Sequence, residues 1–140
     1  MRTTLVTATL TAAALALGTL VPTAAEAASC GGFAYATPFK RGKVSQSNCG
    51  VLGSPGTTVS YRWYVPYPSS GRACVEGLGW VVPQGPTADG RPLPAVEHWF
   101  SLGCGTKGSY GVPWGNIAAV PKVRAQSLAV PLGTPVQWRH

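Results

Sequence analysis

Acid and base side chains are scarce in this chain beyond its first 27 residues. They are three carboxylates and two histidines: Glu76, Asp89, Glu97, His98 and His140. Neighbouring strand residues point to opposite sides, so Glu97 and His98 cannot form a base and its orienting partner. A Ser–His–acid triad on His98 is the remaining enzymatic alternative, but no G-x-S-x-G elbow supports it. We therefore expect a non-enzymatic protein.

Aromatic side chains are more abundant than one small core requires, with five Trp and five Tyr. Trp63, Trp80 and Trp99 occupy core-like positions in predicted strands. The residues that we assign to binding are a cation and three aromatics outside such positions, namely Arg62, Tyr64, Tyr110 and Trp114. Flat rings with polar tips beside a cation can stack on sugars or contact a protein surface. The alternative is that turn aromatics fold back over the sheet as plugs.

A basic turn, Lys40-Arg41-Gly42-Lys43, suggests a function of another class. It lies within the loop that a Cys30–Cys49 bond would close. A braced basic loop can act as a rigid pseudo-substrate of a trypsin-like protease, because preorganisation lowers the entropy lost on binding. The alternative function is therefore a secreted serine-protease inhibitor that uses Lys40 or Arg41; a solvated turn explains the same residues.

The four cysteines predict two disulfides. Short loops close most readily, so we expect Cys30–Cys49 and Cys74–Cys104, although two other connectivities are possible. No C-x-x-C and no close Cys/His pair is present, so the sequence predicts no metal site and no cofactor.

The first residues predict export. Arg2 precedes the apolar run from Leu5 to Leu20, and Ala25-Glu26-Ala27 fits a cleavage site, so residues 1–27 are interpreted as a signal peptide and 28–140 as one secreted, extracellular domain. A lipid anchor at Cys30 would leave three thiols outside the cell, an odd number for disulfide pairing. The apolar run is also short for a membrane span. We expect no membrane span after cleavage.

The net charge of the chain indicates which classes of binding partner to expect. The chain carries +7, and cleavage would remove one Arg and one Glu without changing this value. A basic extracellular domain favours an anionic cell-wall polymer, a glycan or an extracellular protein as partner; solubility is the simpler explanation of the charge. No nucleic-acid recognition motif appears, so we expect no nucleic acid as partner. The sequence indicates no oligomeric state.

Strands must position these residues, since Gly and Pro recur too often for long helices. Residues 57–67 alternate, with Tyr61 and Trp63 on an apolar side and Arg62 and Tyr64 on a mixed side. Further strands are expected at 32–36, 72–82, 95–104, 116–120, 123–130 and 136–138. Short strands separated by turns predict an all-β fold, an antiparallel β-sandwich or, alternatively, a small β-barrel.

Residues 72–82 and 95–104 are expected to form a hairpin. Placing Cys74 opposite Cys104 pairs Leu78 with Phe100 and Trp80 with His98 if the register is constant. In that register Glu76 and Glu97 lie on opposite faces, which excludes a paired-carboxylate site. Glu76 shares the parity of Leu78, so it faces the core unless a bulge near Gly77 turns it outward or an arginine, Arg62 or Arg124, pairs with it.

Overall fold

The computed structural model describes residues 30–85, 87–129 and 131–140, and the predicted signal peptide lies outside them. The described chain is all-β, as predicted, and contains no helix and hence none that could cross a membrane. Its strands are β1 (Gly31–Pro38), β2 (Ser45–Gln46), β3 (Val51–Leu52), β4 (Thr58–Tyr64), β5 (Ala73–Val81), β6 (Val96–Gly105), β7 (Lys107–Pro113), β8 (Ala118–Ala119), β9 (Lys122–Ser127) and β10 (Thr134–Arg139).

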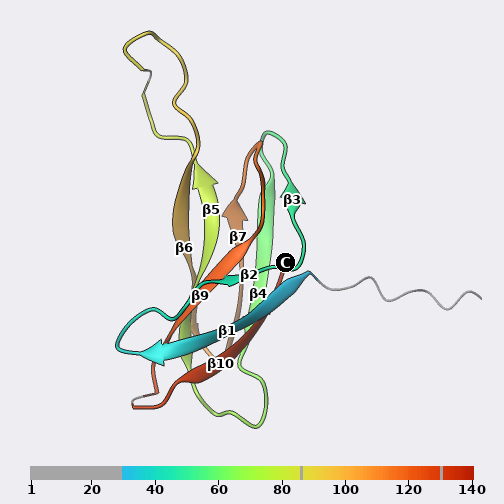
Figure 1. The fold of residues 1–140 in the computed structure, drawn as a ribbon, viewed down its shortest axis with the longest axis vertical. Coiled ribbons are helices and arrows are strands. Elements are labelled where there is room, and N and C mark those ends of the chain that lie inside the picture. The colour runs from blue at the N-terminus through green and yellow to red at the C-terminus, as the bar shows by residue number, and fades with distance from the viewer. Residues whose placement is uncertain (1–29, 86, 130) are drawn as a thin grey trace, which may run out of the picture.

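One curled sheet dominates the fold (Figure 1). Its strand order is β6-β5-β9-β1-β10-β4-β7; β2 pairs with β9, and β3 and β8 form a small separate sheet. The pairs are antiparallel except for β1 with β9. The sheet curls until it is nearly closed, so the architecture is compatible with both a sandwich and a small barrel.

The core fills the inside of this curled sheet. Along β4, Val59, Tyr61 and Trp63 point inward and are buried, as the alternation predicted. The phenol of Tyr61 donates a hydrogen bond to the carbonyl of Leu78 at 2.8 Å, and the indole of Trp63 donates to the carbonyl of Leu102 at 3.1 Å. These two bonds link β4 to β5 and β6 through the interior.

Both predicted disulfides are present. Cys30 bonds Cys49 and Cys74 bonds Cys104, with Cα atoms 5.4 and 4.0 Å apart. The second bond joins directly opposed residues of β5 and β6. Two disulfides indicate an oxidising compartment.

The predicted hairpin register is wrong beyond the cysteines. A bulge shifts the pairing, so that Val75 faces Gly103 but Glu76 faces Ser101. Leu78 therefore lies opposite Trp99 rather than Phe100, Gly79 opposite His98, and Trp80 opposite Glu97. The physical cause is an extra residue in β6 beside Gly103, whose φ of 102° suits a glycine-assisted bulge.

The bulge also changes the faces on which the acids lie. Opposed residues share a face, so Glu97 lies on the same side as Trp80 and, by alternation, as Glu76. The expectation that Glu76 and Glu97 lie on opposite faces is thus wrong. The inward positions of β5 are Val75, Gly77 and Gly79, and Glu76 is on the outer side, where it does not enter the core cluster.

The predicted strand ranges fall on β1, β4, β5, β6, β8, β9 and β10, with ends shifted by up to a few residues. Strand β7 and the short strands β2 and β3 were not predicted from the sequence. Strand β7 contains two glycines and ends at a proline, a composition that disfavours strands. It is held by a seven-residue pairing with β4 from Thr58 to Tyr64.

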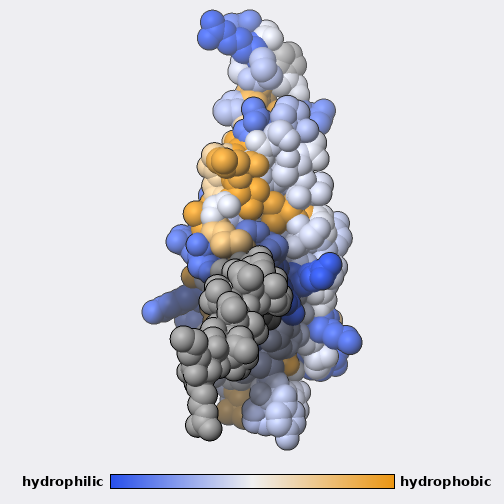
Figure 2. Space-filling view, turned by 90° about the vertical axis from the view of Figure 1, so that its right-hand side faces the viewer, coloured by the Kyte–Doolittle hydropathy of each residue, from blue (hydrophilic) through white to orange (hydrophobic). Residues whose placement is uncertain are grey.

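Hydrophobic residues gather in the upper half of the face in Figure 2, at the level of β3. The β3 residue Leu52 is 87% exposed. Hydrophilic side chains project from both flanks below this area.

Candidate functional site

Arg62 and Tyr64 lie two residues apart on β4 and point outward, as the alternation predicted. Inward-pointing Trp63 between them is buried and fixes their direction. Tyr64 is 38% exposed, and its hydroxyl donates a 2.6 Å hydrogen bond to Oε1 of Gln137 on β10. The tyrosine ring is therefore anchored at its tip while part of the side chain stays accessible.

Strand pairing extends this pair into two rows of outward-pointing side chains. Opposed residues share a face. The first row runs from β1 to β7 through Phe33, Gln137, Tyr64 and Lys107, and the second runs through Gly31, Arg139, Arg62 and Ser109. Tyr35, two residues along β1 from Phe33, points to the same side.

We call this surface the cationic face and define it as the outward residues Phe33, Tyr35, Arg62, Tyr64, Lys107, Gln137 and Arg139. Phe33 and Tyr35 are 59% and 52% exposed. No ion pair involves Arg62, Lys107 or Arg139 within the described part of the chain. The face therefore combines exposed rings with uncompensated positive charge.

Several shallow hollows indent or border the cationic face. Tyr64, Gln137 and Arg139 line one; Ser60, Arg62, Arg139 and His140 line a second. A larger hollow of about 380 Å³ lies beside β1, where Phe33, Tyr35 and Lys43 contribute to its walls. These are open surface depressions that suit an extended ligand more than a small enclosed molecule.

The four residues assigned to binding do not share one surface. Trp114 is 0% exposed, and its indole donates a 2.9 Å hydrogen bond to the carbonyl of Ile117. It is therefore a plug over the core, and its assignment to binding is wrong. Tyr110 is 51% exposed but lies opposite inward-pointing Tyr61, on the side of the sheet that Arg62 and Tyr64 turn away from.

Five members of this surface were not predicted from the sequence: Phe33, Tyr35, Lys107, Gln137 and Arg139. Their common face depends on which strands pair and in what register, and β7 was not predicted at all. The only local signal was the alternation of β1 and β10, where exposed and buried positions follow each other.

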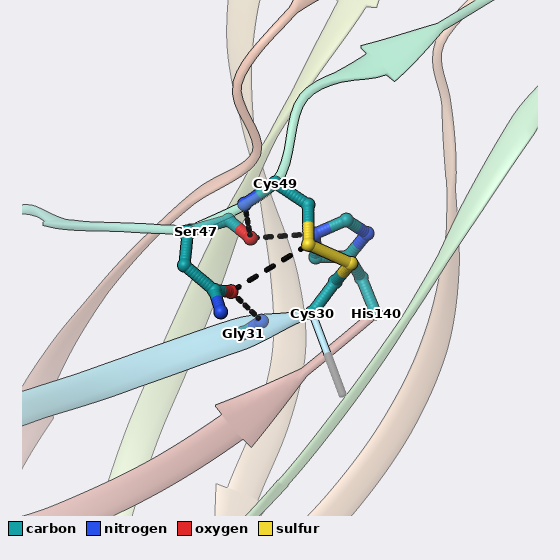
Figure 3. The surroundings of a disulfide bond; sticks show 6 residues. Cys30, Gly31, Ser47, Cys49 and His140 are labelled. Atoms are coloured by element: carbon teal, nitrogen blue, oxygen red, sulfur yellow. Dashed lines mark hydrogen bonds between the residues drawn. A yellow bond between two sulfur atoms is a disulfide. The ribbon is translucent and has the colours of Figure 1, made fainter. Parts of the chain in front are cut away.

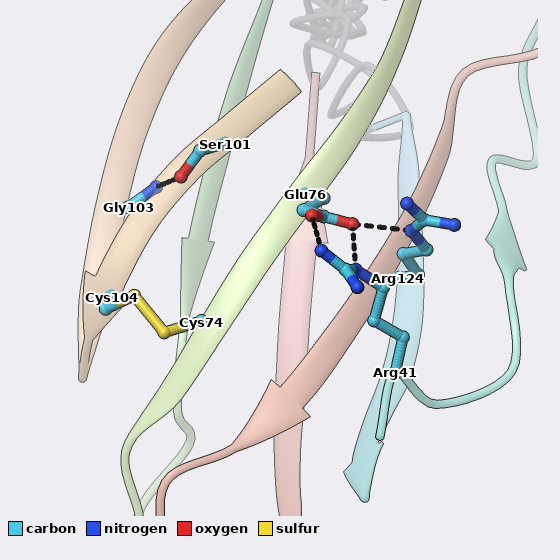
Figure 4. A network of polar contacts seen from close by, with 7 residues as sticks. All are labelled: Arg41, Cys74, Glu76, Ser101, Gly103, Cys104 and Arg124. Carbon is cyan, nitrogen blue, oxygen red and sulfur yellow. Dashed lines mark hydrogen bonds and ion pairs between the residues drawn. A yellow bond between two sulfur atoms is a disulfide. The ribbon is translucent and has the colours of Figure 1, made fainter. Parts of the chain in front are cut away.

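Glu76 is the centre of a second polar cluster, on the outer side of β5 and β9 (Figure 4). Arg41 contacts both of its carboxylate oxygens, at 2.6 and 2.7 Å, and Nε of Arg124 contacts Oε2 at 2.5 Å. Partial burial alone would raise the pKa of Glu76, but the hydrogen bonds and charges of both arginines outweigh it and hold the pKa below its usual value. Arg124 also stacks over the ring of Trp99 at 4.3 Å.

The basic turn is tied down by this cluster. The amide of Gly42 donates to the carbonyl of Ala125 at 2.7 Å, and Arg41 binds Glu76 in a bidentate pair. An inhibitor residue must enter the pocket of its protease, which would require Arg41 to leave this pair. Lys40 is exposed. The arrangement of Arg41 does not favour the inhibitor hypothesis.

A serine and a histidine meet beside the Cys30–Cys49 disulfide (Figure 3). Oγ of Ser47 lies 2.7 Å from Nε2 of His140 and also accepts the amide hydrogen of Cys49 at 3.1 Å. Burial lowers the pKa of His140, which favours the neutral ring. This contact between Ser47 and His140 was not predicted from the sequence. The described ion pairs and hydrogen bonds give His140 no carboxylate to orient it, so the contact lacks the third member of a catalytic triad.

The two remaining acidic side chains described each form an ion pair. Glu97 pairs with Lys122 and Asp89 pairs with Arg91, each at 3.5 Å. Among the described residues, no group of three or more His, Cys, Asp or Glu side chains could hold a metal ion.

Comparison with known proteins returned no match: no family model, no curated protein and no solved structure matches the chain.

Proposed function

We propose that this protein is a non-enzymatic extracellular binding domain that uses the cationic face to hold an anionic cell-wall polymer or glycan. The observation that supports this proposal most is the sorting of charge across the sheet. The described side-chain carboxylates, Glu76, Glu97 and Asp89, are all paired with cations away from this face, whereas Arg62, Lys107 and Arg139 have no such partner. Exposed cations that are not paired with an acid of the same protein favour the binding of an anionic ligand.

The aromatic rings supply the second half of the interaction. Phe33, Tyr35 and Tyr64 stand on the same side as the cations, and Tyr64 is held by Gln137. An anchored ring loses little conformational entropy when a sugar ring or another flat group stacks on it. A polymer that carries both charge and apolar ring faces would contact both kinds of residue.

Retention on insoluble cell-wall material and on neutral chitin, followed through a salt titration, tests the proposal. We expect Arg62→Ser and Tyr64→Ser each to weaken retention on the charged material about 2- to 10-fold, which corresponds to about 0.4–1.4 kcal/mol. Salt should weaken the contribution of Arg62 more than that of Tyr64, because only the former is screened.

Matched controls lie elsewhere on the molecule. Tyr67 is 96% exposed beyond the end of β4, and Arg72 is exposed just before β5. Tyr67→Ser and Arg72→Ser should leave retention within about twofold of the unaltered protein. Absence of retention on every anionic material at low salt would refute the proposed function.

A further inference from the structure

Two arginines of the cationic face stand directly opposite each other. Arg62 of β4 and Arg139 of β10 are partners in the antiparallel register, so their side chains leave the sheet on the same face. Like charges at directly opposed positions destabilise a sheet. Neither guanidinium forms an ion pair with any described residue, and Gly31 on the far side of Arg139 offers no side chain.

The same molecule shows how it accommodates two converging arginines elsewhere. Arg41 and Arg124 approach each other on the opposite half of the sheet, and the carboxylate of Glu76 lies between them (Figure 4). There, three N–H···O contacts from two guanidinium groups satisfy one anion. At Arg62 and Arg139 the corresponding anion is not supplied by the described chain.

We infer that Arg62 and Arg139 form a binding site for a phosphate group of an anionic polymer. The inference rests on the proposed function, because it names the anionic group that the cationic face binds. Arginine forks match phosphate in a bidentate manner. The oxygens of a phosphodiester are arranged tetrahedrally around phosphorus, so its two charged oxygens can accept from two arginines and a hydroxyl that approach from different directions, whereas the two oxygens of a carboxylate lie in one plane with its carbon.

A hollow of about 210 Å³ next to the pair provides room for the group. Ser60 and His140 line it together with the two arginines. Ser60 lies two residues before Arg62 on the same outward side of β4 and is exposed, so its hydroxyl is available as a further donor. The ring of His140 is held in place by Ser47, and burial lowers its pKa, so the positive charge of the hollow comes from the two arginines.

The neighbouring rows suit a chain rather than a single ion. Lys107 and the anchored ring of Tyr64 stand in the adjacent row, one alternation along β4 from Arg62. A polymer with repeated phosphates can place one group at the arginine pair and the next near Lys107. A phosphodiester polymer of the cell surface is therefore the source to which we commit.

The test compares binding of the full domain to inorganic polyphosphate and to poly-L-glutamate of similar charge and length, at matched ionic strength. We expect tighter binding to polyphosphate by at least fivefold. The variants Arg62→Gln and Arg139→Gln should each lose most of that preference, whereas Arg72→Gln removes the same charge from another surface and should keep it.

Thermal unfolding supplies a readout that does not depend on binding assays. In low-salt buffer without multivalent anions, Arg62→Gln should unfold at the same or a higher temperature than the unaltered protein, because it removes a repulsion. Polyphosphate should raise the midpoint of the unaltered protein and of Arg72→Gln but not that of Arg62→Gln. A marked loss of stability in Arg62→Gln without anions would show a structural role and overturn the inference.

The outcomes separate this inference from the proposed function. Equal binding of polyphosphate and poly-L-glutamate, with retention on cell-wall material intact, would overturn the phosphate site and leave the function standing. Failure to bind any anionic material would refute both. Stronger binding to phosphatidylglycerol vesicles than to polyphosphate would assign the pair to a membrane headgroup and overturn the polymer source.

Discussion

The carboxylate of Glu76 compensates two cations, Arg41 and Arg124. It receives hydrogen bonds from Arg41, in the turn after β1, and from Arg124 of β9, so it joins a loop and two strands at a single point. Arg124 and Arg62 were the partners predicted for Glu76 from the sequence. The structure confirms Arg124, adds Arg41, and places Arg62 on another face.

Replacing this carboxylate tests its contribution. Glu76→Gln keeps the shape but leaves two guanidinium groups without an anion, so we expect the free energy of unfolding to fall by about 1–3 kcal/mol at neutral pH. Denaturant titration measures this change. Glu97→Gln is the control: its single contact to Lys122 is exposed, and an exposed pair contributes about 0–1 kcal/mol.

The stability of the unaltered protein and of Glu76→Gln should also depend differently on pH in acid. The pKa of Glu76 is lower in the folded than in the unfolded chain, so its stabilisation is present above the unfolded value near 4.5. It is lost as the pH falls through the lowered folded pKa. Unaltered protein should therefore lose stability below about pH 4.5 more steeply than Glu76→Gln. Parallel curves for the two proteins would contradict this assignment.

At the scale of the elements, β5 is a strand of the curled sheet that turns glycines toward the core. A Cβ on Gly79 would lie 2.2 Å from Cγ1 of Val112 and 2.6 Å from the carbonyl oxygen of Pro113. The missing side chain lets β7 pass close to β5. This close approach explains Gly79, whereas a Cβ on Gly77 would lie 3.1 Å from side-chain atoms of Leu102 and Tyr61.

Gly79→Ala should therefore destabilise the fold by about 1–3 kcal/mol, because the core must shift to admit one methyl group. Thermal or denaturant unfolding gives the value. Gly111→Ala on β7 is the matched control, since a Cβ there has no neighbour within 4 Å and no positive φ is required. Equal stability of the two variants would show that β7 can move away without cost.

Alternation along single strands was predictable, while relations between strands were not. The directions of Tyr61, Arg62 and Tyr64 followed from a period of two. The bulge in β6 could not be located from periodicity, although glycines on both sides of Cys104 were a signal for it. Strand β7 was missed because its stability comes from β4 and from Trp63, whose indole occupies the space beside Gly108. The cationic face depends on these pairings, so only Arg62 and Tyr64 of its members were predicted.

At the scale of the whole molecule, the two disulfides close loops of 19 and 30 residues of separation. The chain-entropy model assigns each bond about 3–4 kcal/mol. We expect Cys30→Ser with Cys49→Ser, and separately Cys74→Ser with Cys104→Ser, to lower the free energy of unfolding by that amount in denaturant titrations. A loss below about 1 kcal/mol for either pair would show that the reduced unfolded chain is already restricted there.

The sorting of charge also determines how the molecule would meet a partner. Glu76 and Glu97 lie on the half of the sheet formed by β5, β6 and β9, whereas Arg62, Lys107 and Arg139 lie on the half formed by β4, β7 and β10. The acids of the first half are compensated by Arg41, Arg124 and Lys122, whereas the cations of the second half are unpaired among the described residues, so the unpaired positive charge lies to one side of the molecule. The field of a negatively charged layer would turn that side toward the layer before contact, which raises the fraction of productive encounters. The half that carries Glu76 then points back toward the solvent.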